Sequence, residues 1–186
     1  MRIISGLLKG KIINFIKNSN TRPLKDSVKE NIFNILKHSN LINIEIEKAN
    51  ILDLYSGIGS FGLECISRGA EKVTFVEESI DAVNILKKNL NLLLINNKAT
   101  IINEKIEDML KNNKKEKFNI FFLDPPFADN EFIKVLNMIQ KNKIYKSRHI
   151  VVLHREKETI DKLDNFIDII LTKKYGRSKV IFGVFK

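Results

Sequence analysis

The stretch Asn119-Ile120-Phe121-Phe122-Leu123-Asp124-Pro125-Pro126-Phe127 decides the fold of this chain. Its apolar run predicts a buried central strand, because strands covered on both faces carry continuous rather than alternating apolar residues. The strand has to end at Asp124, since Pro125 and Pro126 cannot donate backbone hydrogen bonds and force the chain out of regular structure. The sequence therefore delivers a carboxylate, a rigid diproline and the ring of Phe127 together at the carboxyl end of a strand, the edge where open α/β sheets bind ligands.

Transfer of a group to a planar exocyclic amine needs such a set of groups. The lone pair of a nucleobase amine is delocalised into the ring, so an acceptor for its protons, such as the Asp124 carboxylate or the Pro125 carbonyl, favours a more nucleophilic nitrogen. Phe127 can stack on the base and hold that nitrogen in line with the incoming group. Residues 124–127, the Asp124–Phe127 tetrad, resemble motif IV of the amino-methyltransferases, which is Asp, Asn or Ser, then Pro-Pro, then Phe or Tyr. Alone, so short a motif also fits a proline-stiffened turn.

The composition of the 186 residues, 44% hydrophobic and 29% charged, predicts a globular domain with a short appendage. The net charge of +10 favours a polyanionic partner, although a lysine-rich proteome gives the same balance. The single cysteine, Cys65, excludes an internal disulfide and a multi-cysteine metal site. We find neither a signal-peptide pattern nor an apolar run long enough to span a bilayer, so we expect a cytoplasmic protein without membrane contact or metal.

Strands alternating with helices predict an α/β fold, a mainly parallel sheet covered on both faces with a terminal hairpin at one edge. Strands are expected at 50–54, 72–76, 99–102, 119–124 and 149–153, and the closing hairpin at 167–173 and 179–185. Helices are expected at 28–37, 79–92, 106–110, 130–140 and 158–163, and one after the glycines at 57–62 that ends at 68. Residues 1–16 predict a small β-hairpin with a basic edge. We therefore expect an N-terminal extension over 1–40 and the main domain over 41–186.

A glycine loop, Gly57-x-Gly59-x-x-Gly62, lies between a predicted strand and a predicted helix. Glycines allow positive φ and a close approach of the backbone, and the helix amino end offers free N–H groups to a cofactor. Glu77 ends the next strand, where a carboxylate can accept both hydroxyls of a ribose. This outline fits NAD and S-adenosylmethionine alike.

Two features favour S-adenosylmethionine. Asp53 ends the strand just before the loop, where its charge can anchor the amino acid portion of the cofactor; alternatively it is a strand-end cap that ties the loop together. The Asp124–Phe127 tetrad belongs to methyl transfer and has no role in the hydride transfer of a nicotinamide dehydrogenase.

The chain resembles the RsmD family of bacterial methyltransferases over nearly its whole length. The resemblance lies in Asp53–Glu64 with Ser67-Arg68-Gly69-Ala70, in the opening Met1–Gly6, in Thr21-Arg22-Pro23-x-x-Asp26-x-Val28-x-Glu30-x-Ile32-Phe33-Asn34, and in Tyr175-Gly176 before a strand. It implies a Rossmann-like class I methyltransferase fold, with one antiparallel strand, that methylates a guanine N2 of 16S rRNA in an assembled or nearly assembled small subunit. A monomer is the default expectation.

The candidate site residues fall into three groups. The base-facing group is Asp124, Pro125, Pro126 and Phe127. The group for S-adenosylmethionine is Asp53, Tyr55, Gly57, Gly59, Glu77, Glu104 and Asp124. The group for RNA phosphates is Lys9, Lys11, Arg22, Lys25 and Lys29, clustered around the end expected to face RNA.

Two positions depart from the family pattern. After the third strand the family often carries an acid that meets the adenine amino group, but here Lys105 stands near its place. Lysine cannot accept that hydrogen bond, so either Glu104 substitutes or the backbone alone holds the adenine. Lys29 replaces a common arginine, keeping the charge without the bidentate fork for phosphate.

Alternative functions remain open from the sequence. An adenine-N6 methyltransferase on DNA or RNA uses the same tetrad, and a non-catalytic RNA-binding or ribosome-assembly protein could keep a degenerate cofactor site. The histidines His38, His149 and His154 lack metal-ligand spacing, and we interpret them as structural or surface groups. His154 and Arg155 follow the strand predicted at 149–153, at the carboxyl edge of the sheet, and Arg155 is a weaker candidate for a phosphate contact.

Overall fold

The computed structural model describes residues 1–15, 24–112 and 116–186. In chain order the elements are α1 (Asp26–His38), β1 (Asn50–Leu54), α2 (Ser60–Ser67), β2 (Lys72–Val76), α3 (Ile80–Leu93), the 3-10 turn η1 (Asn96–Lys98), β3 (Ala99–Ile102), α4 (Ile106–Asn112), β4 (Phe118–Leu123), α5 (Phe132–Asn142), β5 (Tyr145–Glu156), β6 (Ile167–Tyr175) and β7 (Ser178–Phe185).

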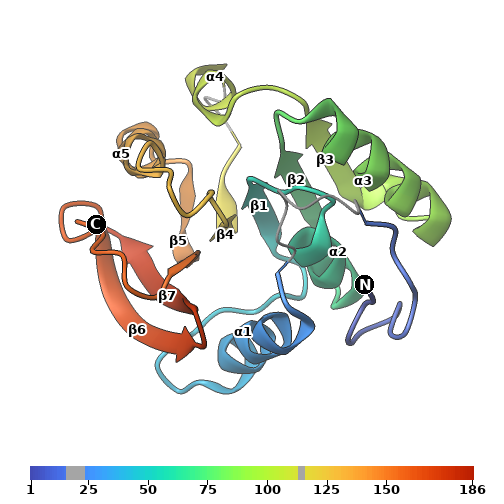
Figure 1. Ribbon diagram of the computed structural model, residues 1–186, viewed down its shortest axis with the longest axis horizontal. Helices are drawn as coiled ribbons and strands as arrows, with labels where there is room; N and C mark the ends of the chain where they lie inside the picture. Colours follow the sequence, from blue (N-terminus) through green and yellow to red (C-terminus); the bar gives the residue numbers. More distant parts are fainter. Residues whose placement is uncertain (16–23, 113–115) are drawn as a thin grey trace.

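The strands form one seven-stranded sheet in the order β3-β2-β1-β4-β5-β7-β6 (Figure 1). The neighbours from β3 to β5 run parallel, whereas β7 lies antiparallel to both β5 and β6. This confirms the predicted mainly parallel sheet with an antiparallel C-terminal strand. β4 lies at its centre between β1 and β5, and five of its six residues are buried. A continuous apolar run is what a strand covered on both faces requires.

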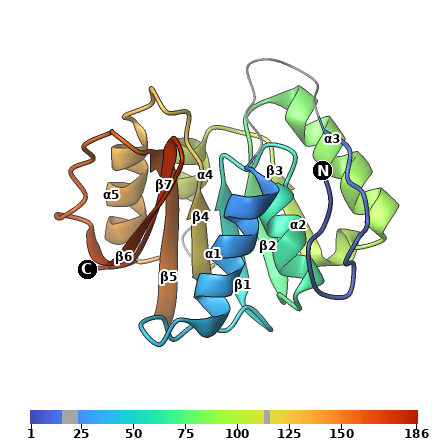
Figure 2. The same ribbon diagram turned by 60° about the horizontal axis from the view of Figure 1, so that its bottom comes forward.

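Helices cover both faces of the sheet (Figure 2). α1, α2 and α3 share one apolar core with one face, and α4 and α5 share a second core with the other. Phe61 of α2 stacks on Phe33 of α1 at 5.1 Å and on Phe122 of β4 at 4.0 Å between ring centroids. These rings tie the N-terminal helix to the strand that precedes the Asp124–Phe127 tetrad.

The first fifteen residues fold back on themselves as the predicted hairpin. Its strands meet at one antiparallel bridge between Arg2 and Ile12, and Ile3 donates its N–H to the Lys11 carbonyl at 3.0 Å. Ile3 and Ile13 are buried in the same core as α1 and α2. The hairpin therefore packs directly on the sheet and its helices.

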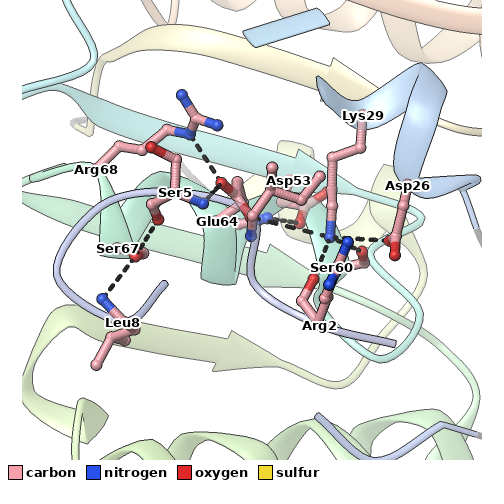
Figure 3. Close-up of polar contacts among 12 residues, drawn as sticks. Arg2, Ser5, Leu8, Asp26, Lys29, Asp53, Ser60, Glu64, Ser67 and Arg68 are labelled. Atoms are coloured by element: carbon pink, nitrogen blue, oxygen red, sulfur yellow. Dashed lines mark hydrogen bonds and ion pairs between the residues drawn. The ribbon is translucent and has the colours of Figure 1, made fainter. Parts of the chain in front are cut away.

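A buried carboxylate, Glu64 of α2, holds the hairpin in place (Figure 3). Its two oxygens accept the backbone N–H groups of Ile4 at 2.7 Å and Ser5 at 2.9 Å. Arg68 Nε donates to it at 2.9 Å, and Lys29 Nζ lies 3.9 Å away. Because the side chains of Glu64 and Lys29 are both fully buried, each charge depends on these partners for the solvation that water no longer gives.

Close approach of the hairpin to α2 requires a glycine. A Cβ built on Gly6 would lie 1.9 Å from the carbonyl oxygen of Ser67, and its φ is +85°. The Ser67 hydroxyl donates to the Ser5 carbonyl at 2.5 Å and accepts the Leu8 N–H at 3.0 Å. Close packing of the hairpin on α2 thus explains why a glycine occupies position 6 in the opening segment that resembles the family.

The position of Lys29 corrects one prediction. Its ammonium donates to the Arg2 carbonyl at 3.1 Å and to the Ser60 hydroxyl at 3.2 Å, and it lies 3.8 Å from the Asp26 carboxylate. Burial lowers the pKa of Lys29, while the nearby carboxylates of Glu64 and Asp26 oppose that shift. The expected contact of Lys29 with RNA phosphate is wrong for this structure, because the side chain is fully buried and its charge is used inside the protein.

Two element predictions also change. The helix predicted at 158–163 is wrong: these residues form turns and irregular chain. There the single hydroxyl proton of Thr159 is within hydrogen-bond reach of the Glu156 carbonyl at 2.8 Å and of the Asp161 carboxylate at 3.0 Å, a local bonding pattern that competes with a helix. β5 is longer than predicted because it begins at Tyr145, which pairs with Phe118 of β4, and because residues 154–156 pair with β7 beyond the end of β4.

We predict that Glu64→Gln lowers the free energy of unfolding by about 2–4 kcal/mol, because it leaves the buried Lys29 with only the partly exposed Asp26 as counter-charge and gives a backbone N–H a poorer acceptor. Chemical denaturation measures this loss. Glu71→Gln is the control, since Glu71 pairs with Lys98 at 3.6 Å but its side chain is 62% exposed; its expected change is below about 1 kcal/mol. Equal effects of the two variants would contradict the role given to Glu64.

Candidate active site at the carboxyl edge of the sheet

The tetrad leaves β4 at the sheet's centre, as the sequence predicted. Asp124 follows Leu123, and its side chain is 23% exposed. Pro125 is buried, Pro126 is exposed and Phe127 is half-buried. The carboxylate and the ring are thus both reachable from the same edge of the sheet.

Two residues of β5 that sequence reasoning did not assign to the site hold the tetrad. His154 Nδ1 lies 2.7 Å from Asp124 Oδ1, and the rings of His154 and Phe127 meet edge-on at 5.8 Å between centroids. Arg155 Nη1 donates to the Pro126 carbonyl at 3.1 Å and Nε to Asp161 at 3.1 Å. Arg155 is fully buried, so it supports the loop instead of contacting phosphate. The sequence signal that could have identified His154 and Arg155 was their position at the carboxyl end of the strand next to β4.

The glycine loop joins β1 to α2, and its glycines differ in their surroundings. Gly57 and Gly59 have positive φ values of +53° and +84°, and Gly59 is the N-cap of α2. A Cβ built on Gly57 would meet nothing within 4 Å. A Cβ on Gly59 would lie 2.4 Å from Leu86 Cδ1, and a Cβ on Gly62 would lie 2.3 Å from the Phe75 ring. The backbone at Gly57 therefore faces open space, while Gly59 and Gly62 allow close packing of the loop and helix.

Tyr55 links the glycine loop to the chain after the tetrad. It has φ +58°, a left-handed conformation that is unfavourable for a residue with a side chain. Its side chain is half-buried near the Asp129 carboxylate, and burial, with a smaller effect of that negative charge, raises the pKa of Tyr55 above its ordinary value. Asp129 also donates its backbone N–H to the Pro126 carbonyl at 2.9 Å. The loops after β1 and β4 are thereby held side by side.

Asp53 is fully buried at the end of β1 with one oxygen in use. Oδ2 accepts the Gly62 N–H at 3.0 Å, which is the strand-end cap weighed from the sequence. Oδ1 is buried and has no hydrogen-bond partner among the described residues. Burial raises the pKa of Asp53 well above its ordinary value, and the negative charges of Asp124 and Glu77 raise it further, against the Gly62 hydrogen bond. A cation next to Oδ1 would give this oxygen a hydrogen-bond or ionic partner and would compensate the accumulated negative charge.

Glu77, at the end of β2, organises the glycine loop. Oε2 accepts the Gly57 N–H at 2.8 Å and Oε1 the Ser79 N–H at 2.8 Å. Asn103, not identified from the sequence, donates to the Glu77 and Glu78 carbonyls at 2.8 and 3.1 Å. A carboxylate has about four acceptor sites, so Glu77 can still receive hydroxyl groups.

The remaining candidates are less closely grouped. Glu104 lines a surface hollow beside α4 with Thr74, Ile102, Met109, Asn112, Glu116 and Phe118, and no residue of the glycine loop is among them. Lys9 and Lys11 are exposed on the hairpin and Lys25 is exposed at the start of α1. Arg22 lies outside the described residues.

Sheet order and site together define the class of protein. A sheet ordered β3-β2-β1-β4-β5-β7-β6 with β7 antiparallel, a glycine loop after β1 and the tetrad after β4 is a class I methyltransferase fold. The putative methyltransferase yhhF from Escherichia coli has the same fold with a TM-score of 0.85 and 26% identity, over 100% of this chain and 98% of that one. A putative methyltransferase complexed with SAH shares the fold at a TM-score of 0.65 and 14% identity, over 81% of this chain and 49% of that one.

Sequence relatives identify the family. The model of the family described as conserved hypothetical protein 95 matches residues 1–184. The putative rRNA methyltransferase YlbH of Bacillus subtilis is 30% identical over 97% of this chain and 96% of its own length. Ribosomal RNA small subunit methyltransferase D of Haemophilus influenzae is 35% identical over 85% of this chain and 80% of its own. The chain belongs to this family, the RsmD family, as its motifs predicted.

The described residues contain neither a membrane-spanning helix nor a metal-binding cluster. None of their helices combines the length and the apolar character needed to cross a membrane. They also contain no group of three or more His, Cys, Asp or Glu side chains that could hold a metal ion.

We predict different stability effects for two substitutions in the glycine loop. Gly59→Ala should lower the free energy of unfolding by about 2–4 kcal/mol, because it combines a strained φ with a clash against Leu86. Gly57→Ala should lower it by only about 1–2 kcal/mol, since it adds the strain alone. Urea unfolding of both variants tests this prediction. An equal decrease in the free energy of unfolding would mean that the space next to the Gly57 backbone is not open.

Proposed function

We propose that this protein transfers a methyl group from S-adenosylmethionine to the exocyclic N2 of a guanine in 16S rRNA of the small ribosomal subunit. The names of its relatives support methyl transfer to ribosomal RNA. The observation that carries the proposal is the meeting of the unpartnered Asp53 oxygen, the open backbone at Gly57 and the Asp124 carboxylate at one edge of the sheet.

The residues present fit S-adenosylmethionine. Asp53 would bind its ammonium group, directly or through water, and the three carboxylates of Asp53, Glu77 and Asp124 favour a positively charged ligand. The backbone at Gly57 would approach the cofactor closely, and Glu77 would accept ribose hydroxyls. When bound, S-adenosylmethionine supplies a methyl group that its sulfonium has already activated.

The tetrad would hold the acceptor base. Asp124 Oδ1 is occupied by His154, whereas Oδ2 makes no hydrogen bond within the described part of the chain and can accept one from the amine. The half-buried Phe127 ring offers a stacking surface for the base. Together they would align the amine nitrogen for an in-line displacement, and its proton then leaves to solvent.

The surface around the hairpin supports an RNA substrate. Lys9, Lys11 and Lys25 are exposed, and the chain carries a net charge of +10. Lysines of this kind neutralise phosphates without reading sequence. We also propose that Arg22 contacts RNA, and that residues 1–40 form the RNA-facing extension of a methyltransferase domain over 41–186. The proposed substrate is the assembled small subunit, and the proposed enzyme is a cytoplasmic monomer.

We predict that Asp124→Ala lowers the rate of methyl transfer at least about 100-fold, because the amine loses the acceptor that orients it. The affinity for S-adenosylmethionine should fall much less, by at most about tenfold, because the variant loses one of three nearby carboxylates while Asp53, Gly57 and Glu77 remain. Labelled methyl transfer and calorimetry measure the two quantities. Asp164→Ala, an exposed carboxylate, is the control and should match the wild type. Parallel loss of binding and transfer would contradict the assignment of Asp124 to the base.

The same assay, run with unmodified small subunits, naked 16S rRNA and duplex DNA, identifies the substrate. Digestion to nucleosides should give N2-methylguanosine from the subunits. N6-methyladenine from any substrate would replace the guanine proposal by its adenine alternative. Cofactor binding without transfer to any of them would favour a binding or assembly role.

We predict that binding of S-adenosylmethionine releases protons. Burial and neighbouring charge raise the pKa of Asp53, and a bound cation lowers it again, so the complex holds fewer protons than the free protein. Affinity should therefore rise with pH above the ordinary carboxyl value near 3.8. Calorimetry in two buffers of different ionisation enthalpy measures the release.

Asp53→Asn should remove this proton release and weaken binding at least about tenfold, because the buried counter-charge is lost. Glu78→Gln is the control, since Glu78 is exposed beside Glu77. Unchanged proton release in Asp53→Asn would show that another group takes the place given to Asp53.

A further inference from the structure

We infer that His154 is the positioning residue for Asp124: it donates a hydrogen bond from Nδ1 to the carboxylate and takes no proton from it. The inference rests on the proposed methyl transfer to an exocyclic amine, and it assigns a role to a residue that shows no motif in the sequence.

Strand register brings the two side chains together. β4 and β5 run parallel with Leu123 opposite Leu153, so Asp124, the first residue after β4, lies beside His154 of β5. Their side chains meet at 2.7 Å, within the range of a charge-assisted hydrogen bond. The His154 side chain is 11% exposed against 23% for Asp124, so the imidazole lies beneath the carboxylate on the protein side.

The second ring nitrogen fixes the direction of this bond. Nε2 is buried and has no hydrogen-bond partner among the described residues. A proton on Nε2 would be a buried donor without an acceptor, which is disfavoured. The proton of the neutral ring therefore belongs on Nδ1, and an ionised carboxylate can only accept it. His154 in this form has no free lone pair facing Asp124 and cannot receive a proton from it.

β5 holds the tetrad at both ends. His154 binds the carboxylate and packs its ring against Phe127, and the next residue, Arg155, donates to the Pro126 carbonyl at 3.1 Å. With Oδ1 held by His154, Oδ2 is directed away from the imidazole and remains for the substrate amine. The position of the acceptor oxygen is thus set by a buried ring and not by the flexible aspartate alone.

The proton balance of the reaction agrees with this role. The bond from sulfur to the methyl carbon breaks as the bond from that carbon to the amine nitrogen forms, and the sulfonium becomes a neutral thioether. The amine nitrogen becomes positively charged and loses one proton to solvent. Asp124 orients this nitrogen throughout, and no proton has to enter His154.

Three substitutions at His154 test the inference. Asn places an amide N–H near the position of Nδ1, Gln places it near Nε2, and Leu has no donor. We expect His154→Asn to keep kcat within about fivefold of the wild type, and His154→Gln and His154→Leu to lose about 100-fold. KM for RNA and the affinity for S-adenosylmethionine should stay within about threefold in all three. Thermal unfolding of each variant confirms that the comparison is between folded proteins.

Either of two kinetic results would overturn the inference. If folded His154→Asn is as slow as His154→Leu, the ring itself is needed to take up a proton. If His154→Gln and His154→Leu are as fast as the wild type, the carboxylate is positioned without a donor from β5.

A spectroscopic measurement tests the tautomer without any turnover. Nitrogen-15 NMR of the imidazole in the cofactor-free protein should show the proton on Nδ1, with His154→Asn used to assign the signal. A proton on Nε2 alone would overturn the inference even in an active enzyme. If the wild type transfers no methyl group to any RNA, the proposed function fails, yet this spectrum still decides the direction of the hydrogen bond.

Discussion

The buried carboxylate of Glu64 is the constraint on which the rest of the structure depends. It accepts backbone N–H groups from the hairpin, pairs with Arg68 at the C-cap of α2 and lies near Lys29 of α1 (Figure 3). Lys29 in turn donates to Ser60, the first residue of the helix that follows the glycine loop. Removing one partner of such a network leaves another charge buried without compensation, so hairpin, α1 and glycine loop are stable only together.

A different balance holds at the carboxyl edge. Asp53, Glu77 and Asp124 bring negative charge together, and Asp53 keeps one oxygen without a partner in the part of the chain that the structure describes. Burying a charge in this way is unfavourable for the protein alone. Under the proposed function a cationic cofactor compensates this buried charge, so its binding stabilises the folded protein. Backbone strain at Tyr55 is found in the same place, as expected where structure serves a ligand.

Two adjacent strands, β4 and β5, together fix the positions of the groups at this edge of the sheet. β4 presents the tetrad, and β5 holds it through His154 and Arg155, which are buried and therefore fixed. Both residues lie one step along the sheet from the reacting groups, in a strand that is itself locked between β4 and β7. A loop that starts with two prolines and is hydrogen-bonded from beneath has little freedom left to move.

The sequence by itself determined the class of fold, the central strand at 119–124, the glycine loop and the carboxyl edge as the candidate site, because apolar runs, prolines and glycines act locally. Only the tertiary structure decided that Lys29 is buried, that His154 and Arg155 hold the tetrad and that Asp53 has one oxygen free. These facts depend on which distant segments meet: Lys29 and Glu64 are brought together by helix packing, and His154 reaches Asp124 only through strand register. A lysine or a histidine has no local pattern that distinguishes a surface position from a buried one, so its partners decide its role.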